Sequence, residues 1–136
     1  MIYQSTRDDS LTATSAQAIL DGMARDGGLY SPVSLRDAAF DWQALLPLST
    51  QNMATKILAA LLPSFSEAEM ADLVRQAYAN KFETAELTPT VSVGDDTILE
   101  LFRGPTSAFK DVALSMLPVL MTASRKSAAS RTRFLS

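Results

Sequence analysis

Residues 104–111 read Gly-Pro-Thr-Ser-Ala-Phe-Lys-Asp, and they join a strand-like run at 98–102 to a helix-like run at 112–123. A strand followed by an apolar helix indicates a mixed α/β fold, with Lys110 at the start of that helix. The positive end of the helix dipole disfavours the ammonium form of an amine there. Burial would favour the neutral amine further and make it a Schiff-base nucleophile. Most lysines at helix starts are solvated, so Lys110 is either an ordinary surface residue or a Schiff-base nucleophile.

Three stretches of this chain match motifs that occur together in one enzyme family. Residues 100–113 read E-L-F-R-G-P-T-S-A-F-K-D-V-A, residues 1–7 read M-I-Y-Q-S-T-R, and residues 26–32 read D-G-G-L-Y-S-P. They resemble the E-L-F-H-G-P-T-x-A-F-K-D-x-A, Y-x-S-T-R and D-G-G-L-Y-x-P motifs of the threonine synthases, in the family's order and at about its spacing. The resemblance covers the whole chain. Arg103 replaces the usual His and Ser107 a commonly larger residue, and both changes would alter the pocket wall.

The resemblance implies the fold type II scaffold of pyridoxal-phosphate enzymes. Residues 1–82 are then a helical amino-terminal domain, and residues 83–136 are the first strands and helix of the α/β cofactor domain. Family members run to several hundred residues. After the lysine helix they carry a strand and an S-G-D-T-G loop that cradles the cofactor phosphate. Residues 133–136, Arg-Phe-Leu-Ser, resemble the start of that strand, so we expect a truncated amino-terminal piece of a longer enzyme.

The resemblance also implies the chemistry. Threonine synthases convert O-phospho-L-homoserine and water to L-threonine and phosphate with pyridoxal 5'-phosphate as cofactor. Lys110 would carry that cofactor as a Schiff base, as the catalytic and cofactor-binding residue. Phe109 would pack beside the cofactor, although a core aromatic is an equally common role. Gly104 and Pro105 would set the turn that aims the lysine, and Asp111 would compensate the helix dipole. The isolated chain is expected to be inactive because the phosphate loop is not in it.

The other two motifs allow a functional and a structural interpretation. Hydroxyl and guanidinium groups suit a phosphate, so Ser5, Thr6 and Arg7 are candidates for the substrate-phosphate site or a domain interface. A structural role for these three is the more common outcome. Residues 26–28, Asp-Gly-Gly, are better interpreted as a turn that ends a helix, since glycine permits a positive φ and a close backbone approach.

Composition excludes several kinds of site. The 136 residues include no cysteine and no histidine, which rules out disulfides, thiolate metal sites and a Ser-His-Asp triad. The sequence contains no D-x-D-x-D loop of the kind that binds calcium, so we expect no metal site. The first ten residues contain charged side chains rather than the apolar core of a signal peptide, and residues 112–123 are too short to span a bilayer. We therefore expect a cytoplasmic protein without a membrane partner.

Charge is unevenly divided along the chain. Residues 1–102 carry six basic and fourteen acidic side chains, whereas residues 103–136 carry six basic and one acidic. A positive carboxyl-terminal segment suits an anionic cofactor and a phosphorylated small-molecule substrate. Aromatic residues do not interleave the basic ones and no recognition motif occurs, so nucleic-acid binding is not expected.

Capping residues and apolar periodicity predict the elements of the first half. Residues 1–6 are expected to be extended. A first helix is predicted to be capped by Ser15 and ended by residues 27–28. A short helix is predicted at 41–46, followed by a longer one that Thr50 caps and that stops before residue 63.

The second half is predicted in the same way. Ser66 and Glu69 form a capping-box pattern ahead of a helix, whose apolar stripe comprises Met70, Leu73, Val74, Ala77 and Tyr78. A turn at 94–96 predicts a hairpin. A final helix from Asp111 to about Ser124 is apolar nearly all round, which is typical of helices buried on several sides. Too little sequence follows it in this chain to cover it, so we expect it to be poorly covered here and to lack its packing partners.

Three functions stay open at this point. The chain is part of a threonine synthase, or part of a related phospho-lyase that eliminates phosphate from phosphohomoserine or a similar ester. The third is a non-catalytic helical interaction module left by loss of the cofactor domain. A reading frame that continues into S-G-D-T-G would favour one of the two enzymes. A stop codon after residue 136 would favour the non-catalytic module. The apolar final helix also predicts either self-association through residues 98–124 or disorder there.

Overall fold

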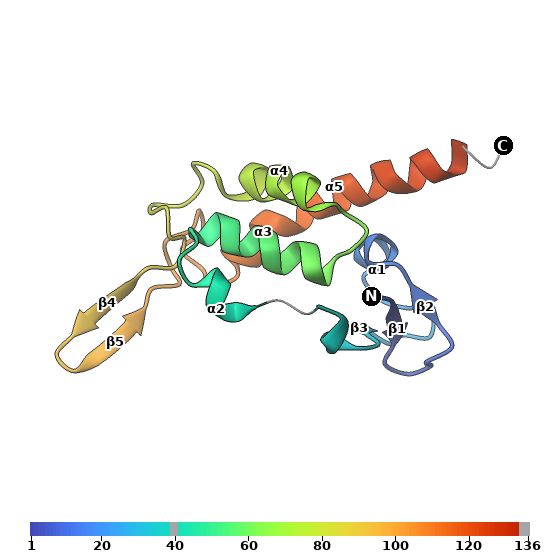
Figure 1. Ribbon diagram of the computed structural model, residues 1–136, viewed down its shortest axis with the longest axis horizontal. Coiled ribbons are helices and arrows are strands. Elements are labelled where there is room, and N and C mark those ends of the chain that lie inside the picture. Colours follow the sequence, from blue (N-terminus) through green and yellow to red (C-terminus); the bar gives the residue numbers. More distant parts are fainter. Residues whose placement is uncertain (39–40, 134–136) are drawn as a thin grey trace.

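The computed structural model describes residues 1–38 and 41–133 of the chain. Figure 1 shows a small amino-terminal sheet, a body of helices and a projecting hairpin. In chain order the elements are β1 (Tyr3–Ser5), β2 (Thr12–Ala13), α1 (Ser15–Asp21), β3 (Tyr30–Pro32), the 3-10 helix η1 (Leu35–Ala38), α2 (Trp42–Leu45), α3 (Thr50–Leu61), α4 (Glu67–Tyr78), β4 (Thr90–Val93), β5 (Asp96–Leu99) and α5 (Asp111–Arg133). This mixed α/β architecture agrees with the predicted fold class.

The amino-terminal segment forms an antiparallel sheet in the order β2-β1-β3. Tyr3 lies opposite Ala13 on one side and Pro32 on the other. The prediction that the first residues are extended is therefore confirmed by β1. The Tyr3 hydroxyl donates to the Leu61 carbonyl at 2.6 Å, which attaches the sheet to the end of α3.

The helical body encloses the main core. α4 contacts both α3 and α5, and α1 packs against α5. The predicted capping box at Ser66 and Glu69 is present, and four of the five predicted stripe residues of α4 are fully buried while Leu73 is partly buried. The buried cluster comprises Ala16, Phe65, Met70, Val74, Ala77, Tyr78, Leu87, Met116 and Leu120. The last two belong to α5, so the lysine helix shares its core with the helices that precede it.

The predicted cap of α1 is wrong by one residue. Thr14, not Ser15, accepts a hydrogen bond from the Gln17 amide, at 3.2 Å. Ser15 is buried, and its hydroxyl donates to Ser64 Oγ at 2.8 Å while the Ser64 amide donates back at 3.1 Å. This bond between distant segments occupies the hydroxyl that the local sequence offers as a cap.

Two more helix boundaries differ from the prediction, and one agrees. α1 ends at Gly22, which has a φ of 67°, and not at residues 27–28. α3 is capped by Ser49 rather than Thr50, since Ser49 accepts from the Asn52 amide at 3.3 Å. The short helix expected at 41–46 is confirmed as α2, which Asp41 caps.

The predicted hairpin is present, formed by β4 and β5 (Figure 1). Its turn is residues 94–95 rather than 94–96, because Asp96 already pairs with Val93. Gly94 has a φ of 61°, the left-handed region that two-residue hairpin turns require. Every residue of both strands is exposed.

α5 is longer than predicted, and one of its faces is uncovered, as expected. It continues past the expected end at Ser124 to Arg133. Met116 and Leu120 lie in the core, whereas the opposite face exposes Leu114, Leu117 and Met121. The expectation that this helix is poorly covered in the isolated chain is therefore confirmed. Pro118 lies on the exposed side, where its missing N–H removes one helical hydrogen bond.

Within residues 1–38 and 41–133, no helix combines the length and the apolarity needed to cross a membrane. The same part of the chain brings together no group of three His, Cys, Asp or Glu side chains able to hold a metal ion. The predicted strand start at residues 133–136 lies outside the described residues, apart from Arg133, which ends α5.

Candidate active site

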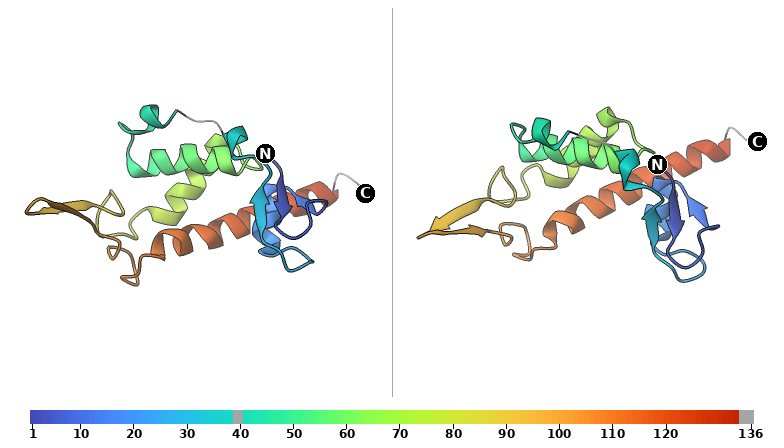
Figure 2. Two further views of the ribbon diagram at one scale, coloured as in Figure 1. Left: turned by 90° about the horizontal axis from the view of Figure 1, so that it is seen from below. Right: turned by 60° about the horizontal axis from the view of Figure 1, so that its bottom comes forward.

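Lys110 lies at the end of the loop that joins β5 to α5 (Figure 2). Its carbonyl accepts from the Leu114 amide at 2.8 Å, so its backbone already belongs to the first turn of the helix. The side chain is exposed, and among the described side chains it forms no ion pair. The predicted position at a helix start is confirmed, whereas this chain does not bury the amine. An exposed amine without an ion-pair partner is accessible to an aldehyde.

Asp111, the first residue of α5, holds the loop in front of Lys110. It is only 4% exposed. Its Oδ2 accepts from the Thr106 amide at 2.7 Å, and its Oδ1 accepts from the Thr106 hydroxyl at 2.5 Å. The bond from that hydroxyl, followed by the bond from the amide, lowers the pKa of Asp111. The carboxylate also lies at the positive end of the helix, as the sequence predicts.

Gly104 permits this close contact between loop and helix. It is buried, and a Cβ at this position would lie 2.6 Å from both the Cβ and the Oδ2 of Asp111. The Ser107 amide donates to the Gly104 carbonyl at 3.1 Å. Ser107 has a φ of 56°, a conformation that costs a non-glycine residue about 1–3 kcal/mol. The role of Thr106 in holding Asp111 was not predicted from the sequence. The pattern that could have indicated it is a hydroxyl residue between a Gly-Pro turn and an acidic helix start.

Phe109 precedes the lysine and is 72% exposed. The alternative that it is a core aromatic is therefore wrong for this chain. Its exposed ring leaves the other interpretation, a contact with the cofactor, as a prediction.

Arg103, which stands at the position of the family's usual His, closes the base of the hairpin. Its Nε donates to Glu100 at 2.8 Å and its Nη1 donates to Glu83 at 2.8 Å. The hydrogen bond with Glu83, followed by that with Glu100, raises the pKa of Arg103. The Glu83 amide also donates to the Arg103 carbonyl at 3.0 Å. The arginine is thus tied to two carboxylates immediately before the Gly104 turn.

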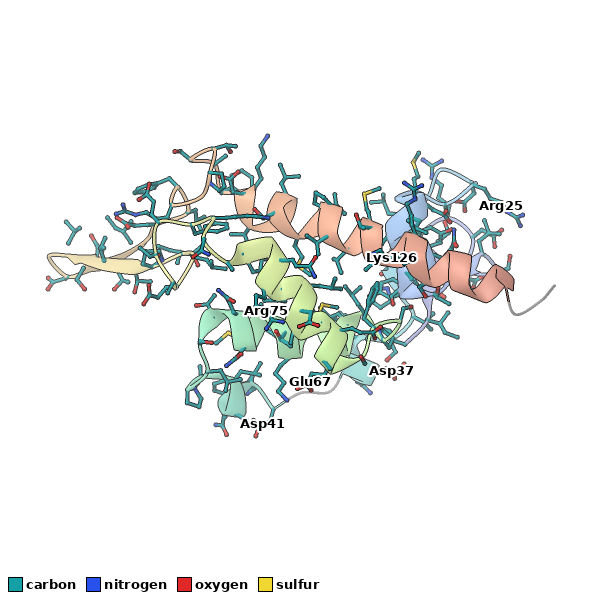
Figure 3. All side chains as sticks on the ribbon, turned by 90° about the horizontal axis from the view of Figure 1, so that it is seen from above. Arg25, Asp37, Asp41, Glu67, Arg75 and Lys126 are labelled. Carbon is teal, nitrogen blue, oxygen red and sulfur yellow. The ribbon has the colours of Figure 1, made fainter. Side chains whose placement is uncertain are left out.

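The other three lysines lie in different surroundings. Lys56 pairs with Glu67 at 2.6 Å. Lys81 follows the end of α4. Lys126 lies along α5, well away from the loop that carries Lys110 (Figure 3). Only Lys110 combines a helix start with an unpaired, exposed amine and a loop held by side-chain hydrogen bonds.

An open groove of about 830 Å³ lies between α4 and α5. Its walls include Phe65, Leu73, Pro118 and Val119, with Lys126 at its edge. Lys110 does not line it. Schiff-base formation requires the Lys110 amine, which is not in the groove. We therefore place the candidate site at the loop before α5.

The two amino-terminal motifs bind each other. The Ser5 hydroxyl donates to the carboxylate of Asp26, with its oxygens at 2.7 and 2.9 Å. The Gly28 amide donates to Asp26 Oδ1 at 2.8 Å, and Arg7 Nη1 donates to the Asp26 carbonyl at 3.1 Å. The bond from Gly28, followed by that from Ser5, lowers the pKa of Asp26. Leu29 completes the contact, since its amide donates to the Thr6 hydroxyl at 3.0 Å.

These contacts favour the structural interpretation of both motifs. The hydroxyls of Ser5 and Thr6 are engaged within the protein, and residues 26–28 form a turn that docks on β1 rather than the end of α1. Figure 2 shows the sheet at one end of the molecule and the loop before α5 at the other. The three motifs therefore do not converge on one site in this chain.

Comparison with known proteins gives the family. The model of the threonine synthase N terminus matches residues 2–78. The chain belongs to the threonine synthase family. The threonine synthase of Saccharomyces cerevisiae is 38% identical over 126 residues, an alignment that covers 85% of this chain and 24% of the yeast protein. This chain thus spans about a quarter of the length of the curated threonine synthases it matches.

Solved threonine synthases share the fold as well. The structure of PLP-bound threonine synthase from Brucella melitensis superposes with a TM-score of 0.82 at 33% identity, over 95% of this chain and 28% of that one. Threonine synthase from Escherichia coli gives a TM-score of 0.80 at 28% identity, over 92% of this chain and 28% of that one. The predicted fold class is therefore confirmed: the chain matches the amino-terminal part of these threonine synthases.

Proposed function

We propose that this chain is the lysine-bearing amino-terminal part of a threonine synthase that converts O-phospho-L-homoserine and water to L-threonine and phosphate. The observation that carries the proposal is the exposed, unpaired amine of Lys110 at the start of α5, on a loop that Asp111 and Thr106 hold. Family membership supports the reaction, and the motif around the lysine supports the residue.

Of the groups that would bind pyridoxal phosphate, this chain supplies the amine that would react with the cofactor aldehyde. An aldehyde needs an accessible amine without an ion-pair partner, and Lys110 offers one. When bound, the cofactor supplies an electron sink for carbanion chemistry. Lys110 would hold it and would move protons at the substrate carbons, and Phe109 would lie beside it. Residues 1–136 contain no S-G-D-T-G loop, so the cofactor phosphate would be held by residues from the rest of the enzyme.

The domain division belongs to the same proposal. Residues 1–82 would form the amino-terminal domain and residues 83–136 the start of the cofactor domain. In this chain the two share a core, because Met116 and Leu120 of α5 pack in the same cluster as Met70 of α4. A cytoplasmic location stays a prediction.

Product analysis of the full-length protein tests the proposal. Incubation with O-phospho-L-homoserine should release phosphate and L-threonine in equal amounts. Phosphate without threonine would identify the related phospho-lyase instead. A full-length protein that releases neither, from a reading frame without the S-G-D-T-G loop, would favour the non-catalytic helical module.

We expect the 136-residue chain by itself to have no measurable threonine synthase activity. A nucleophile without the groups that orient cofactor and substrate loses most of the rate advantage of positioning, which reaches roughly 10⁵–10⁸ M in effective concentration. The assay is phosphate release from O-phospho-L-homoserine by the purified chain with added pyridoxal phosphate. Measurable turnover of O-phospho-L-homoserine by the purified chain would contradict this prediction.

We also expect the chain to self-associate through residues 98–124. The exposed face of α5, with Leu114, Leu117 and Met121, and the hairpin, all of whose strand residues are exposed, leave apolar surface uncovered. Light scattering should show species larger than a monomer, and Leu117→Glu should shift the protein toward the monomer.

The matched control is Leu35→Glu, which changes an exposed leucine on η1, outside this region. It should leave the association unchanged. A monomer whose amides at 112–124 are as protected from exchange as those of the first helices would contradict both self-association and disorder.

A further inference from the structure

Thr106 and Asp111 join the two ends of the loop before α5. Thr106 and Asp111 are joined twice, through the amide at 2.7 Å and through the hydroxyl at 2.5 Å. We call this pair of bonds the 106–111 latch. Asp111 is buried and uses both carboxylate oxygens in it. The Asp111 amide also donates to the Ala108 carbonyl at 3.0 Å, so backbone and side chain of the same residue hold the loop.

We propose that the 106–111 latch positions Lys110 and keeps its amine unpaired. The proposal rests on the proposed function only in assuming that the reacting amine is that of Lys110. The latch makes Thr106 and Asp111 positioning residues, and nothing in it requires them to touch a substrate.

The latch holds the backbone around Lys110. The latch encloses residues 107–110, and the side chains of Phe109 and Lys110 lie outside it, both exposed. The Lys110 carbonyl is bound to Leu114 in α5, while the next residue is bound back to the loop. The backbone of Lys110 is therefore held by the first turn of α5 and by the residue that follows it. A fixed backbone removes conformational freedom that a reacting group would otherwise lose in each turnover.

The latch also engages the negative charge beside Lys110. Asp111 is the carboxylate next to Lys110 in the chain, and it is turned toward Thr106 rather than toward the amine. If the Thr106 hydroxyl were absent, one Asp111 oxygen would lose its partner. Lys110 is the adjacent cation in the chain, so the freed oxygen would become available to its ammonium group, and pairing there would slow the reaction of the amine with an aldehyde. The Thr106 hydroxyl thus keeps the Asp111 carboxylate from forming an ion pair with Lys110.

Competitive labelling of the 136-residue chain tests this inference. The chain is treated with pyridoxal phosphate and borohydride, and peptide mapping gives the labelling of Lys110 relative to Lys126 in the same molecule. Thr106→Val, which has nearly the same shape without the hydroxyl, should lower that ratio about two- to fivefold, the range of an exposed ion pair. Thr106→Ser keeps the hydroxyl and should restore the wild-type ratio.

Thr122→Val is the matched control. It removes a hydroxyl on the exposed side of α5 that bonds only to the Pro118 carbonyl at 2.8 Å, and it should leave the ratio unchanged. A Thr106→Val ratio equal to wild type, or a Thr106→Ser ratio as low as that of Thr106→Val, would overturn the proposal. These readouts report the amine itself, so they are independent of whether the full-length enzyme proves to be a threonine synthase.

Amide exchange in the unmodified chain gives a second test that no folding defect can obscure. The Thr106 amide lies in a loop but donates to a buried carboxylate. It should therefore exchange about tenfold or more slowly than a free loop amide, as expected for a charge-assisted bond of about 1.5–3 kcal/mol. A Thr106 amide that exchanges as fast as its exposed neighbours would show that the latch does not form.

Discussion

Lys110→Ala in the full-length enzyme should abolish cofactor attachment and lower threonine formation by more than about a thousandfold. The amine is both the point of attachment and the group that moves protons at the substrate carbons. Alanine leaves no amine there, while the 106–111 latch contains no atom of the lysine side chain, so the loop should keep its shape. Absorbance of the bound cofactor and threonine production are the measurements.

Lys126→Ala is the control for this substitution. It removes a lysine of α5 that lines the α4–α5 groove, and it should leave both readouts unchanged. Borohydride reduction and peptide mapping of the wild-type enzyme should place the pyridoxyl group on Lys110. A pyridoxyl group on another lysine, or unchanged cofactor absorbance in Lys110→Ala, would overturn the assignment.

Gly28→Ala should lower the free energy of unfolding by about 2–4 kcal/mol. Its Cβ would lie 2.0 Å from Ser5 Oγ and 3.1 Å from the Arg7 nitrogen, so the Ser5–Asp26 contact would have to open. Gly28 is not among the glycines with a positive φ, which means that the clash rather than backbone strain accounts for the loss. Urea denaturation followed by circular dichroism measures it.

The double variant Ser5→Ala, Gly28→Ala separates this clash from a general effect of the turn. Removing Ser5 Oγ gives the new Cβ room, so the two losses should be less than additive by more than about 0.5 kcal/mol. Additive losses would show that the close approach of these two motifs is not what makes residue 28 a glycine.

Local patterns predicted the helices well where the deciding contacts are local. The capping box at Ser66 and the apolar stripe of α4 follow from spacing alone, and both are present. The cap of α1 failed because Ser15 binds Ser64, forty-nine residues away. The exposed face of α5 was expected, because the helix is apolar nearly all round and too little sequence follows it in this chain to cover it.

At the candidate site, too, local features were predicted and contacts that depend on the path of the chain were not. The sequence placed Lys110 at a helix start, which is a local property of residues 98–123. It did not show that Asp111 turns back to Thr106, since that depends on the path of the loop. Likewise, the Ser5–Asp26 bond joins motifs twenty-one residues apart, and it turns a candidate phosphate site into a structural contact.

The shared core of the early and late helices has a consequence for biosynthesis. Met116 and Leu120 complete the cluster that contains Ala16 and Met70, so the body cannot close when α4 has just been made. The ribosome must add about forty further residues after residue 82, which takes roughly 2–8 s at about 5–20 residues per second. During that interval the faces of α1 and α4 that α5 will cover remain in contact with solvent. The nascent chain thus passes through a period in which those apolar faces are open to chaperones or to other nascent chains, and the emergence of the lysine helix ends it.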